Sequence, residues 1–130
     1  MDVCAEILVR TVGGGGNLLL NVGPMPTGEI EPRQVAILLG LGQWLRTVAP
    51  AVYGTRPGPF KPGPWGASTC RGRSVYLHVL LPESDRLELP PIGARIRKAH
   101  LHGGGAVWFE QNDRGVSIRL PAATDRAVIV

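Results

Sequence analysis

The sequence predicts a mixed fold in which one β/α unit precedes an antiparallel β-sandwich, and three observations predict it. Residues 17–22 hold three consecutive leucines between two asparagines, and a continuous apolar run bounded by turn residues is typical of a strand buried on both faces. Residues 32–48 have the hydrophobic spacing of a helix. Beyond residue 66 the hydrophobic period becomes two, in short runs separated by turn residues. A two-sided strand followed by a helix is half of a repeating β/α arrangement, and the chain offers no second such unit.

The first segment, residues 2–12, is expected to be the end of an amphipathic helix. Val3 and Ile7 share one face, while Glu6 and Arg10 form an i,i+4 ion pair on another. The glycine run at 13–16 ends this helix. A phosphate-binding glycine loop follows a strand and precedes a helix, whereas these glycines follow a helix and precede a strand, so we do not expect one.

The helix expected over 32–48 has signals at both ends. Pro32 suits the first helical position, because the amide hydrogen that proline lacks has no helical partner there. Glu29 and Glu31 complement the helix dipole, and Pro50 is expected to end the helix. Apolar side chains cover most of its circumference, so neighbours are expected on more than one side.

Residues 54–66 contain four prolines, which fix φ and remove backbone donors. This segment is expected to be an irregular linker, laid over the surface by Phe60 and Trp65. It divides the chain into a first module at 1–53 and a sandwich at 67–130.

The second module is expected to be a series of short strands. In the first of them Val75, Leu77 and Val79 alternate inward, and His78 falls on the outward side with a structural role. Glycine-rich and proline-rich turns separate the runs, as in an antiparallel sandwich. The expected strands are 73–81, 87–89, 94–101, 106–110, 115–120 and 127–130.

Composition and charge argue against several classes of partner. The net charge is +4, but the basic residues are scattered and aromatics are only 5% of the chain, whereas nucleic-acid binding requires a basic stripe with stacking aromatics. No uninterrupted apolar run of membrane-spanning length and no signal peptide are visible. We therefore expect neither nucleic acid nor membrane as a partner. Cys4 and Cys70 lack metal-binding spacing, their pairing is left open, and no cofactor is expected.

Several blocks of sequence together resemble the carboxy-terminal part of the α-L-fucosidases, glycoside hydrolase family 29, over essentially the whole chain. The blocks are Gly-Asn-Leu-Leu-Leu-Asn-Val-Gly-Pro at 16–24, Gly-Glu-Ile at 28–30, Trp-Leu at 44–45, Val-Tyr-Gly-Thr-Arg at 52–56, Trp-Gly at 65–66 and Val-Tyr-Leu-His-Val at 75–79.

The resemblance implies a fold and a parent activity. Family members join a catalytic (β/α)8-like barrel to a carboxy-terminal β-sandwich, and they hydrolyse α-L-fucosides with retention. Residues 17–22 would then be the last barrel strand, 32–48 the last barrel helix and roughly 67–130 the sandwich. The family carries its nucleophile and its acid/base residue on upstream strands that this chain does not contain. No catalytic residue is therefore carried over.

Three polar residues lie near the carboxyl end of the expected strand, where barrel enzymes place their sites. Retaining hydrolysis requires two carboxyl groups about 5 Å apart, and Glu29 and Glu31 are the only carboxylates there. We interpret both as exposed carboxylates that interact favourably with the dipole at the start of the following helix. Asn21 is the weak candidate for substrate binding, although a role in tying neighbouring strands together is favoured.

Two other pairs of side chains suggest sites. His100 and His102 alternate onto one strand face, but no third metal ligand lies close in sequence, so a polar strand face is favoured and no metal site is expected. Trp65 and Trp108 would suit a sugar-stacking platform, but covering the sandwich core is the favoured interpretation.

An isolated apolar strand and helix cannot stay exposed in a monomer. We therefore expect a homo-oligomer, or completion by a missing barrel fragment. The residues expected at the self-association interface are Leu18, Leu20, Leu38, Leu41 and Leu45. Alone, the chain is expected to be a non-catalytic, self-associating structural module. The alternatives are a carbohydrate-binding module for fucosylated glycans and a subunit of a split or reassembled fucosidase.

Overall fold

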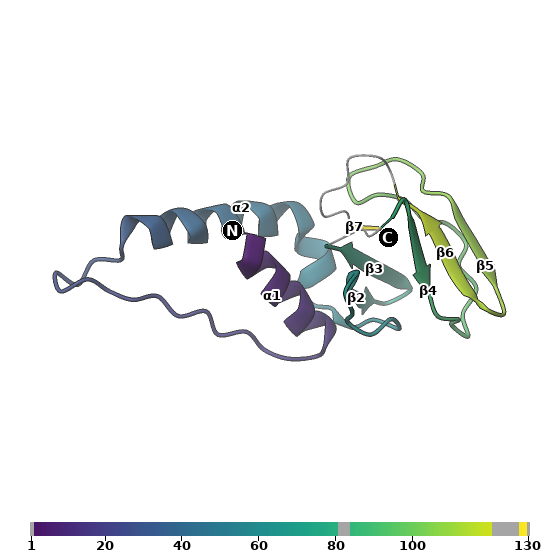
Figure 1. Ribbon diagram of the computed structural model, residues 1–130, viewed down its shortest axis with the longest axis horizontal. Helices are drawn as coiled ribbons and strands as arrows, with labels where there is room; N and C mark the ends of the chain where they lie inside the picture. Colours follow the sequence, from purple (N-terminus) through teal and green to yellow (C-terminus); the bar gives the residue numbers. More distant parts are fainter. Residues whose placement is uncertain (1, 81–83, 121–127, 130) are drawn as a thin grey trace.

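Two helices occupy one end of the molecule and two small antiparallel sheets occupy the other (Figure 1). The computed structural model describes residues 2–80, 84–120 and 128–129. The amino-terminal half of the second helix, with the chain segment before it, projects away from the sheets (Figure 1). The long axis of the molecule therefore runs from a helical end to a sandwich end.

Helix α1 spans Asp2–Gly13, as the sequence predicts, with the expected Glu6–Arg10 ion pair at 2.9 Å. The buried face is not the expected one, because Ala5 and Val9 are fully buried while Val3 and Ile7 are exposed. The small side chains let α1 approach the first sheet closely, where Val9 packs on Ala67 and Leu80. A methyl group added at Gly13 would lie 2.6 Å from the Ala67 Cβ, so glycine is required for this approach.

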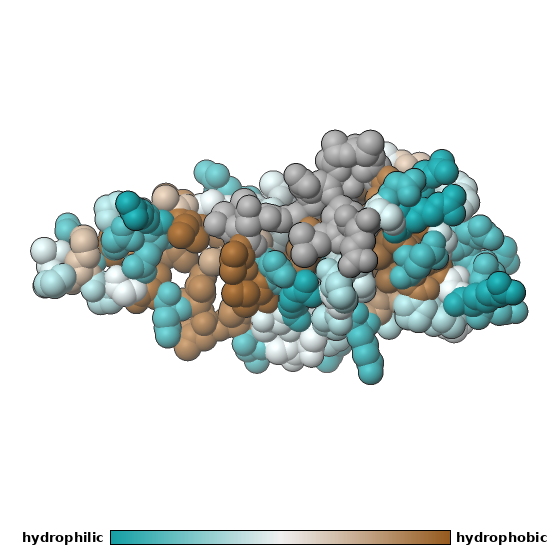
Figure 2. Space-filling view, viewed as in Figure 1, coloured by the Kyte–Doolittle hydropathy of each residue, from teal (hydrophilic) through white to brown (hydrophobic). Residues whose placement is uncertain are grey.

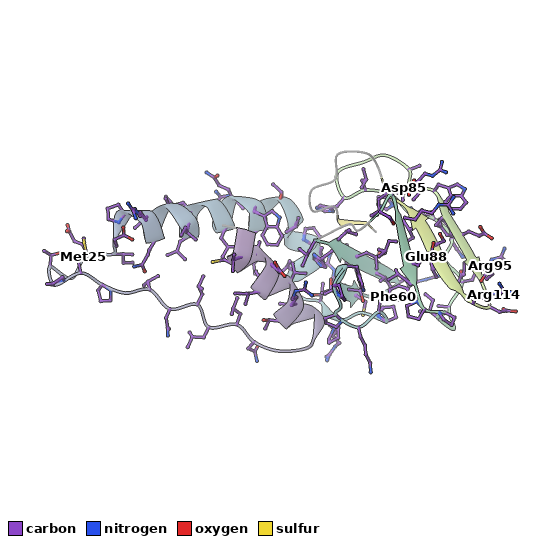
Figure 3. The ribbon with its side chains drawn as sticks, in the orientation of Figure 1. Met25, Phe60, Asp85, Glu88, Arg95 and Arg114 are labelled. Atoms are coloured by element: carbon purple, nitrogen blue, oxygen red, sulfur yellow. The ribbon has the colours of Figure 1, made fainter. Side chains whose placement is uncertain are left out.

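Residues 17–22 do not form the expected strand in this chain. They are extended, but no neighbouring strand among the described residues pairs with them. The segment runs out to a turn around Met25 at the tip of the molecule (Figure 3). The physical reason is that a strand needs a second strand to bond its amide and carbonyl groups, and the described part of the chain supplies only an isolated bridge between Pro24 and Ile30.

Helix α2 spans Pro32–Val52 and continues past the expected end at 48–50. Pro50 lies in its last turn, where its missing amide hydrogen and its ring disturb only one turn of helix. Packing outweighs this cost, because Val48, Ala51 and Val52 are buried with Tyr76 of the first sheet. By length and apolar composition alone α2 is able to cross a membrane, which the sequence analysis did not expect, and core helices of soluble proteins share these two properties.

The first sheet has the strand order β1-β2-β3-β7, and all its pairs are antiparallel. Its strands are β1 (Arg56–Pro57), β2 (Gly66–Arg71), β3 (Ser74–Val79) and β7 (Val128–Ile129). Strand β1 lies within the segment expected to be an irregular linker, so that expectation is wrong at this point. Proline is tolerated there because β1 is an edge strand. Phe60 does not lie on the surface but is buried in the core, where Ser68 Oγ bonds both its amide (3.0 Å) and its carbonyl (2.7 Å).

The second sheet has the order β4-β6-β5 and is also antiparallel. Its strands are β4 (Arg86–Leu89), β5 (Phe109–Asn112) and β6 (Gly115–Arg119). The main core lies between the two sheets and joins Leu77 and Val79 to Leu87, Val116 and Ile118. The inward alternation that the sequence predicts for Val75, Leu77 and Val79 is therefore confirmed, whereas the strand expected at 106–110 is found at Phe109–Asn112.

The expected strand at 94–101 is absent apart from an isolated bridge between His100 and Ala106. Side-chain bonds replace the ladder, since Gln111 accepts from the Ile96 amide (2.9 Å) and donates to the Ala94 carbonyl (2.7 Å). A segment whose amide and carbonyl groups are satisfied in this way has no need of a partner strand.

Gly66 is the position in the first sheet at which a side chain would do most harm. Its φ is +141°, and an added Cβ would lie 1.8 Å from the His78 carbonyl oxygen. We expect Gly66→Ala to lower the free energy of unfolding by more than about 2 kcal/mol, through strain and displacement of β3. Denaturant unfolding followed by circular dichroism measures this change.

The matched control is Gly42→Ala in α2, where an added Cβ meets nothing within 4 Å. This change should raise the free energy of unfolding by about 0.5–1 kcal/mol, because alanine is the better helix former. Equal effects of the two substitutions would contradict the steric explanation.

Candidate functional site

The helical end carries an exposed apolar surface, which Figure 2 shows as a brown region over α2 and the segment before it. Leu19 is 83% exposed and Leu39 is 63% exposed. Exposed apolar areas of this kind mark interaction sites in soluble proteins. The residues of this apolar surface are Val3, Ile7, Leu19, Leu20, Ile30, Val35, Ile37 and Leu39.

The residues predicted for self-association differ in their exposure. Leu20 belongs to the apolar surface. Leu18, Leu38 and Leu45 are half-buried, and Leu45 packs against the cluster around Val48. Leu41 is only 7% exposed, so it is already covered by its own chain. The side chains that α2 offers to a partner are therefore mainly Val35, Ile37 and Leu39, rather than Leu41.

The polar candidates near the tip do not form a cluster. Asn21 is exposed, and no hydrogen bond of its side chain is found within the described part of the chain. Glu29 accepts a bond from Thr27 (3.2 Å), and Glu31 lies 3.9 Å from Arg33. These partners suit residues at the start of a helix.

Gln34 holds this loop to α2, a role that the sequence reading missed. Its Oε1 accepts from the Gly23 amide (2.9 Å) and its Nε2 donates to the Gly23 carbonyl (3.4 Å). A single amide side chain thus satisfies both backbone groups of one residue, as a neighbouring strand would. The only sequence signal was a polar residue in the first turn of an otherwise apolar helix.

His78 lies in a buried polar cluster where β2 and β3 meet the end of α2. The Ala51 carbonyl accepts hydrogen bonds from Thr69 Oγ1 (2.6 Å) and His78 Nε2 (3.2 Å), and Thr69 Oγ1 lies 3.0 Å from His78 Nε2. Because a carbonyl can only accept, neutral His78 carries its proton on Nε2. His78 is on the strand face opposite Leu77 and Val79, as predicted, but α2 covers that face and leaves it only 2% exposed.

This environment opposes protonation of His78. Burial lowers the pKa of His78 from 6.5 to about 4. The hydrogen bond to the Ala51 carbonyl acts in the opposite direction and raises the pKa, while the nearby His102 lowers it further. The Nδ1 atom, which would take the second proton, is buried and has no partner in the described residues. His78 is therefore a neutral structural residue at physiological pH.

In the two remaining candidate pairs, His100 with His102 and Trp65 with Trp108, the two members make different contacts. His102 Nε2 donates to the Thr47 carbonyl (2.7 Å), while the His100 backbone forms the bridge to Ala106. Trp65 packs on the core, whereas Trp108 is 48% exposed. In the described residues no group of three or more metal-ligating side chains is present, and Cys4 and Cys70 are free thiols.

Comparison with known proteins assigns the chain to a family. A family model described as alpha-L-fucosidase matches residues 3–49. An α-L-fucosidase of Branchiostoma floridae is 33% identical over 133 residues, which cover 95% of this chain and 29% of that protein, and the human tissue α-L-fucosidase is 35% identical over 131 residues, covering 93% and 28%. The chain corresponds to the carboxy-terminal part of the α-L-fucosidases.

Solved structures agree with this assignment. An α-L-fucosidase isoenzyme from Paenibacillus thiaminolyticus superimposes with a TM-score of 0.85 at 27% identity, over 98% of this chain and 33% of that one. A family 29 α-L-fucosidase from Bacteroides thetaiotaomicron, trapped as a covalent intermediate, gives 0.85 at 27% identity, over 98% and 31%. The two small antiparallel sheets thus match the carboxy-terminal region of family 29 fucosidases. The chain spans less than a third of the length of these curated relatives.

The buried state of His78 makes stability depend on pH. The folded protein protonates His78 only near pH 4, while the unfolded chain does so near pH 6.5, so unfolding takes up a proton between these values. The stabilisation that the folded protein gains from neutral His78 is complete above pH 6.5. As the pH falls to 4 this stabilisation is lost, and the free energy of unfolding decreases by about 3 kcal/mol. Denaturant unfolding at a series of pH values measures it.

The comparison that isolates this contribution uses His78→Gln, whose amide can still donate to the Ala51 carbonyl but does not titrate. We expect its stability to change less between pH 6.5 and 4 than that of the unmodified protein. His100→Gln, a half-buried position, is the control and should keep the full change. Parallel pH profiles for the unmodified protein and His78→Gln would contradict the assignment.

Proposed function

We propose that this chain is a non-catalytic, carboxy-terminal part of a retaining α-L-fucosidase whose apolar surface packs against the rest of the catalytic barrel. The observation that carries the proposal is the exposure of Leu19, Leu39 and their neighbours on a segment and a helix that are apolar on more than one side. A covered parallel sheet uses such strands and helices as internal elements.

Residues 17–22 and α2 then act as the last strand and the last helix of the barrel. The extended backbone of 17–22 has amide and carbonyl groups ready to pair with neighbouring barrel strands. The Gln34 side chain holds the end of this segment to α2, so strand and helix are presented together. The carboxyl end of the segment, with Asn21 beside it, would face the sugar-binding end of the barrel.

A second part of the proposal is that copies of the isolated chain associate through the same surface. Apolar side chains of a helix that no other element of the described chain covers are stabilised by contact with another apolar surface. Identical chains most often form closed symmetric assemblies.

The first test is turnover of an aryl α-L-fucoside by the purified chain. We expect none, because Glu29 is engaged by Thr27 and Glu31 lies near Arg33, and among the described residues no opposed pair of carboxyl groups is present at this end. Addition of the upstream barrel segment as a separate chain is expected to restore hydrolysis. Turnover by the chain alone that disappears in Glu29→Gln or Glu31→Gln would refute the non-catalytic role.

The second test is the molar mass of the purified chain, measured by multi-angle light scattering at micromolar concentration. We expect an assembly larger than one chain, and a shift to the monomer in Leu19→Glu and in Leu39→Glu, since each buries a charge in the contact. Tyr53→Glu, at a position outside the apolar surface that is about as exposed as Leu39, is the control and should leave the assembly intact. A monodisperse, unmodified monomer would rule out self-association.

A further inference from the structure

The outer face of the second sheet carries a row of three side chains that the proposed function does not use. Arg86 and Arg119 are directly opposite each other on β4 and β6. The Arg119 amide donates to the Trp108 carbonyl (3.0 Å), which brings Trp108 into the same row. The adjacent row, Leu87, Ile118 and Phe109, faces the core. Because side chains alternate along a strand, the row of Arg86, Arg119 and Trp108 faces away from the core.

Both arginines are placed over the same indole ring. The guanidinium carbons of Arg86 and Arg119 lie 5.6 Å and 5.8 Å from the centroid of the Trp108 ring. These contacts place two positive charges, carried by residues directly opposite each other in the sheet, around one aromatic ring. Almost half of Trp108 stays exposed, so the ring also offers surface to a ligand.

The sequence breaks a local rule at this position. Like charges directly opposite each other on neighbouring strands destabilise a sheet, and the two described ion pairs of the chain, Glu6–Arg10 and Glu31–Arg33, involve neither arginine. Places where a sequence departs from local preference are commonly functional sites. A shared anion between the two guanidinium groups would relieve the repulsion and accept their donors together.

The next outward row along the strands has the opposite character. Glu88 and Glu110 both stand opposite Ser117, and the Ser117 hydroxyl donates to Glu88 Oε1 (2.6 Å). Residues two apart on a strand are separated by about 7 Å, which is close to the width of one sugar ring. The face therefore presents an anion-binding edge, an aromatic surface and, beside them, carboxylates that accept bonds from hydroxyl groups.

We propose that this face binds a sugar that carries one anionic group, a sulfate or a carboxylate, with the ring on Trp108 and the anion between Arg86 and Arg119. The adjacent Glu88 and Glu110 favour a ligand with hydroxyl groups at that end. The same carboxylates repel a continuous polyanion, so nucleic acid fits the face less well. The site is built from residues of the second sheet and its border, and it shares no residue with the apolar surface.

The test is isothermal titration calorimetry of the whole chain at low ionic strength with four probes: glucose 6-sulfate, glucuronic acid, glucose and inorganic sulfate. We expect one or both anionic sugars to bind at least roughly tenfold more tightly than glucose or sulfate, because ring and anion contacts act together. The stronger of the two identifies the anionic group. Equal affinity for inorganic sulfate and both anionic sugars would overturn the proposal.

Variants separate the two contacts. Arg119→Gln and Arg86→Gln should each weaken anionic-sugar binding roughly tenfold and leave glucose binding unchanged. Trp108→Ala should remove the advantage of the anionic sugar over sulfate, and Trp108→Phe, which keeps an aromatic face, should restore much of it. The circular dichroism spectrum of each variant shows that it is folded.

The control is the double variant Arg95→Gln with Arg114→Gln, which removes one more positive charge than either test variant. Its two exposed arginines lie near the opposite end of the second sheet, away from Asp85 and its neighbour Arg86 (Figure 3). Binding should be unchanged in this double variant. An equal loss there, full binding by Trp108→Ala, or tighter binding of a single-stranded oligonucleotide than of either anionic sugar would each refute the site.

Discussion

The Ala51 carbonyl is the point on which the junction between the helical end and the sandwich depends. The last carbonyls of a helix have no helical partner and must be satisfied from elsewhere. Here Thr69 and His78 reach across from the first sheet to the Ala51 carbonyl, and the Thr55 hydroxyl donates to the Val52 carbonyl (2.8 Å). The sheet thus completes the helix, and this permits α2 to continue beyond Pro50 into the core.

The two ends of the molecule differ in how completely they bury their apolar side chains and pair their backbone groups. The sandwich end buries Phe60 and the inward residues of both sheets. In its irregular segment at 94–101, the Gln111 side chain forms hydrogen bonds with the Ile96 amide and the Ala94 carbonyl. Within the described residues, the helical end leaves an extended segment without a partner strand and a helix with apolar side chains uncovered on more than one side. The proposed covering of these elements by the rest of a barrel is supported by the greater length of the relatives, of which this chain spans 29% and 33%.

Local patterns in the sequence predict where helices and strands lie better than they predict which elements pack against each other. The alternation of Leu77 and Val79 and of Leu87 and Leu89 is enough to identify inward faces, and Pro32 is enough to place a helix start. The burial of His78 was missed because it depends on α2 lying across β3, which is a long-range contact. Tyr76 on the same face was the available signal, since it made that side of the strand partly apolar as well. Trp108 was named with Trp65 as a possible sugar-stacking residue, but its contacts with Arg86 and Arg119 were missed, because the three residues are far apart in sequence and meet only through strand register.

The bond between Ala51 and His78 also sets an order on the biogenesis of the chain. The two residues are 27 positions apart, and α2, which contains Ala51, is synthesised before β3, which contains His78. During translation α2 therefore leaves the ribosome before the strands that complete its end, and domains in synthesis fold as their segments emerge. The helical end must remain unfinished until β3 has been made. Until then the apolar residues of α2 that pack on Tyr76 are exposed, and transiently exposed apolar surface promotes aggregation.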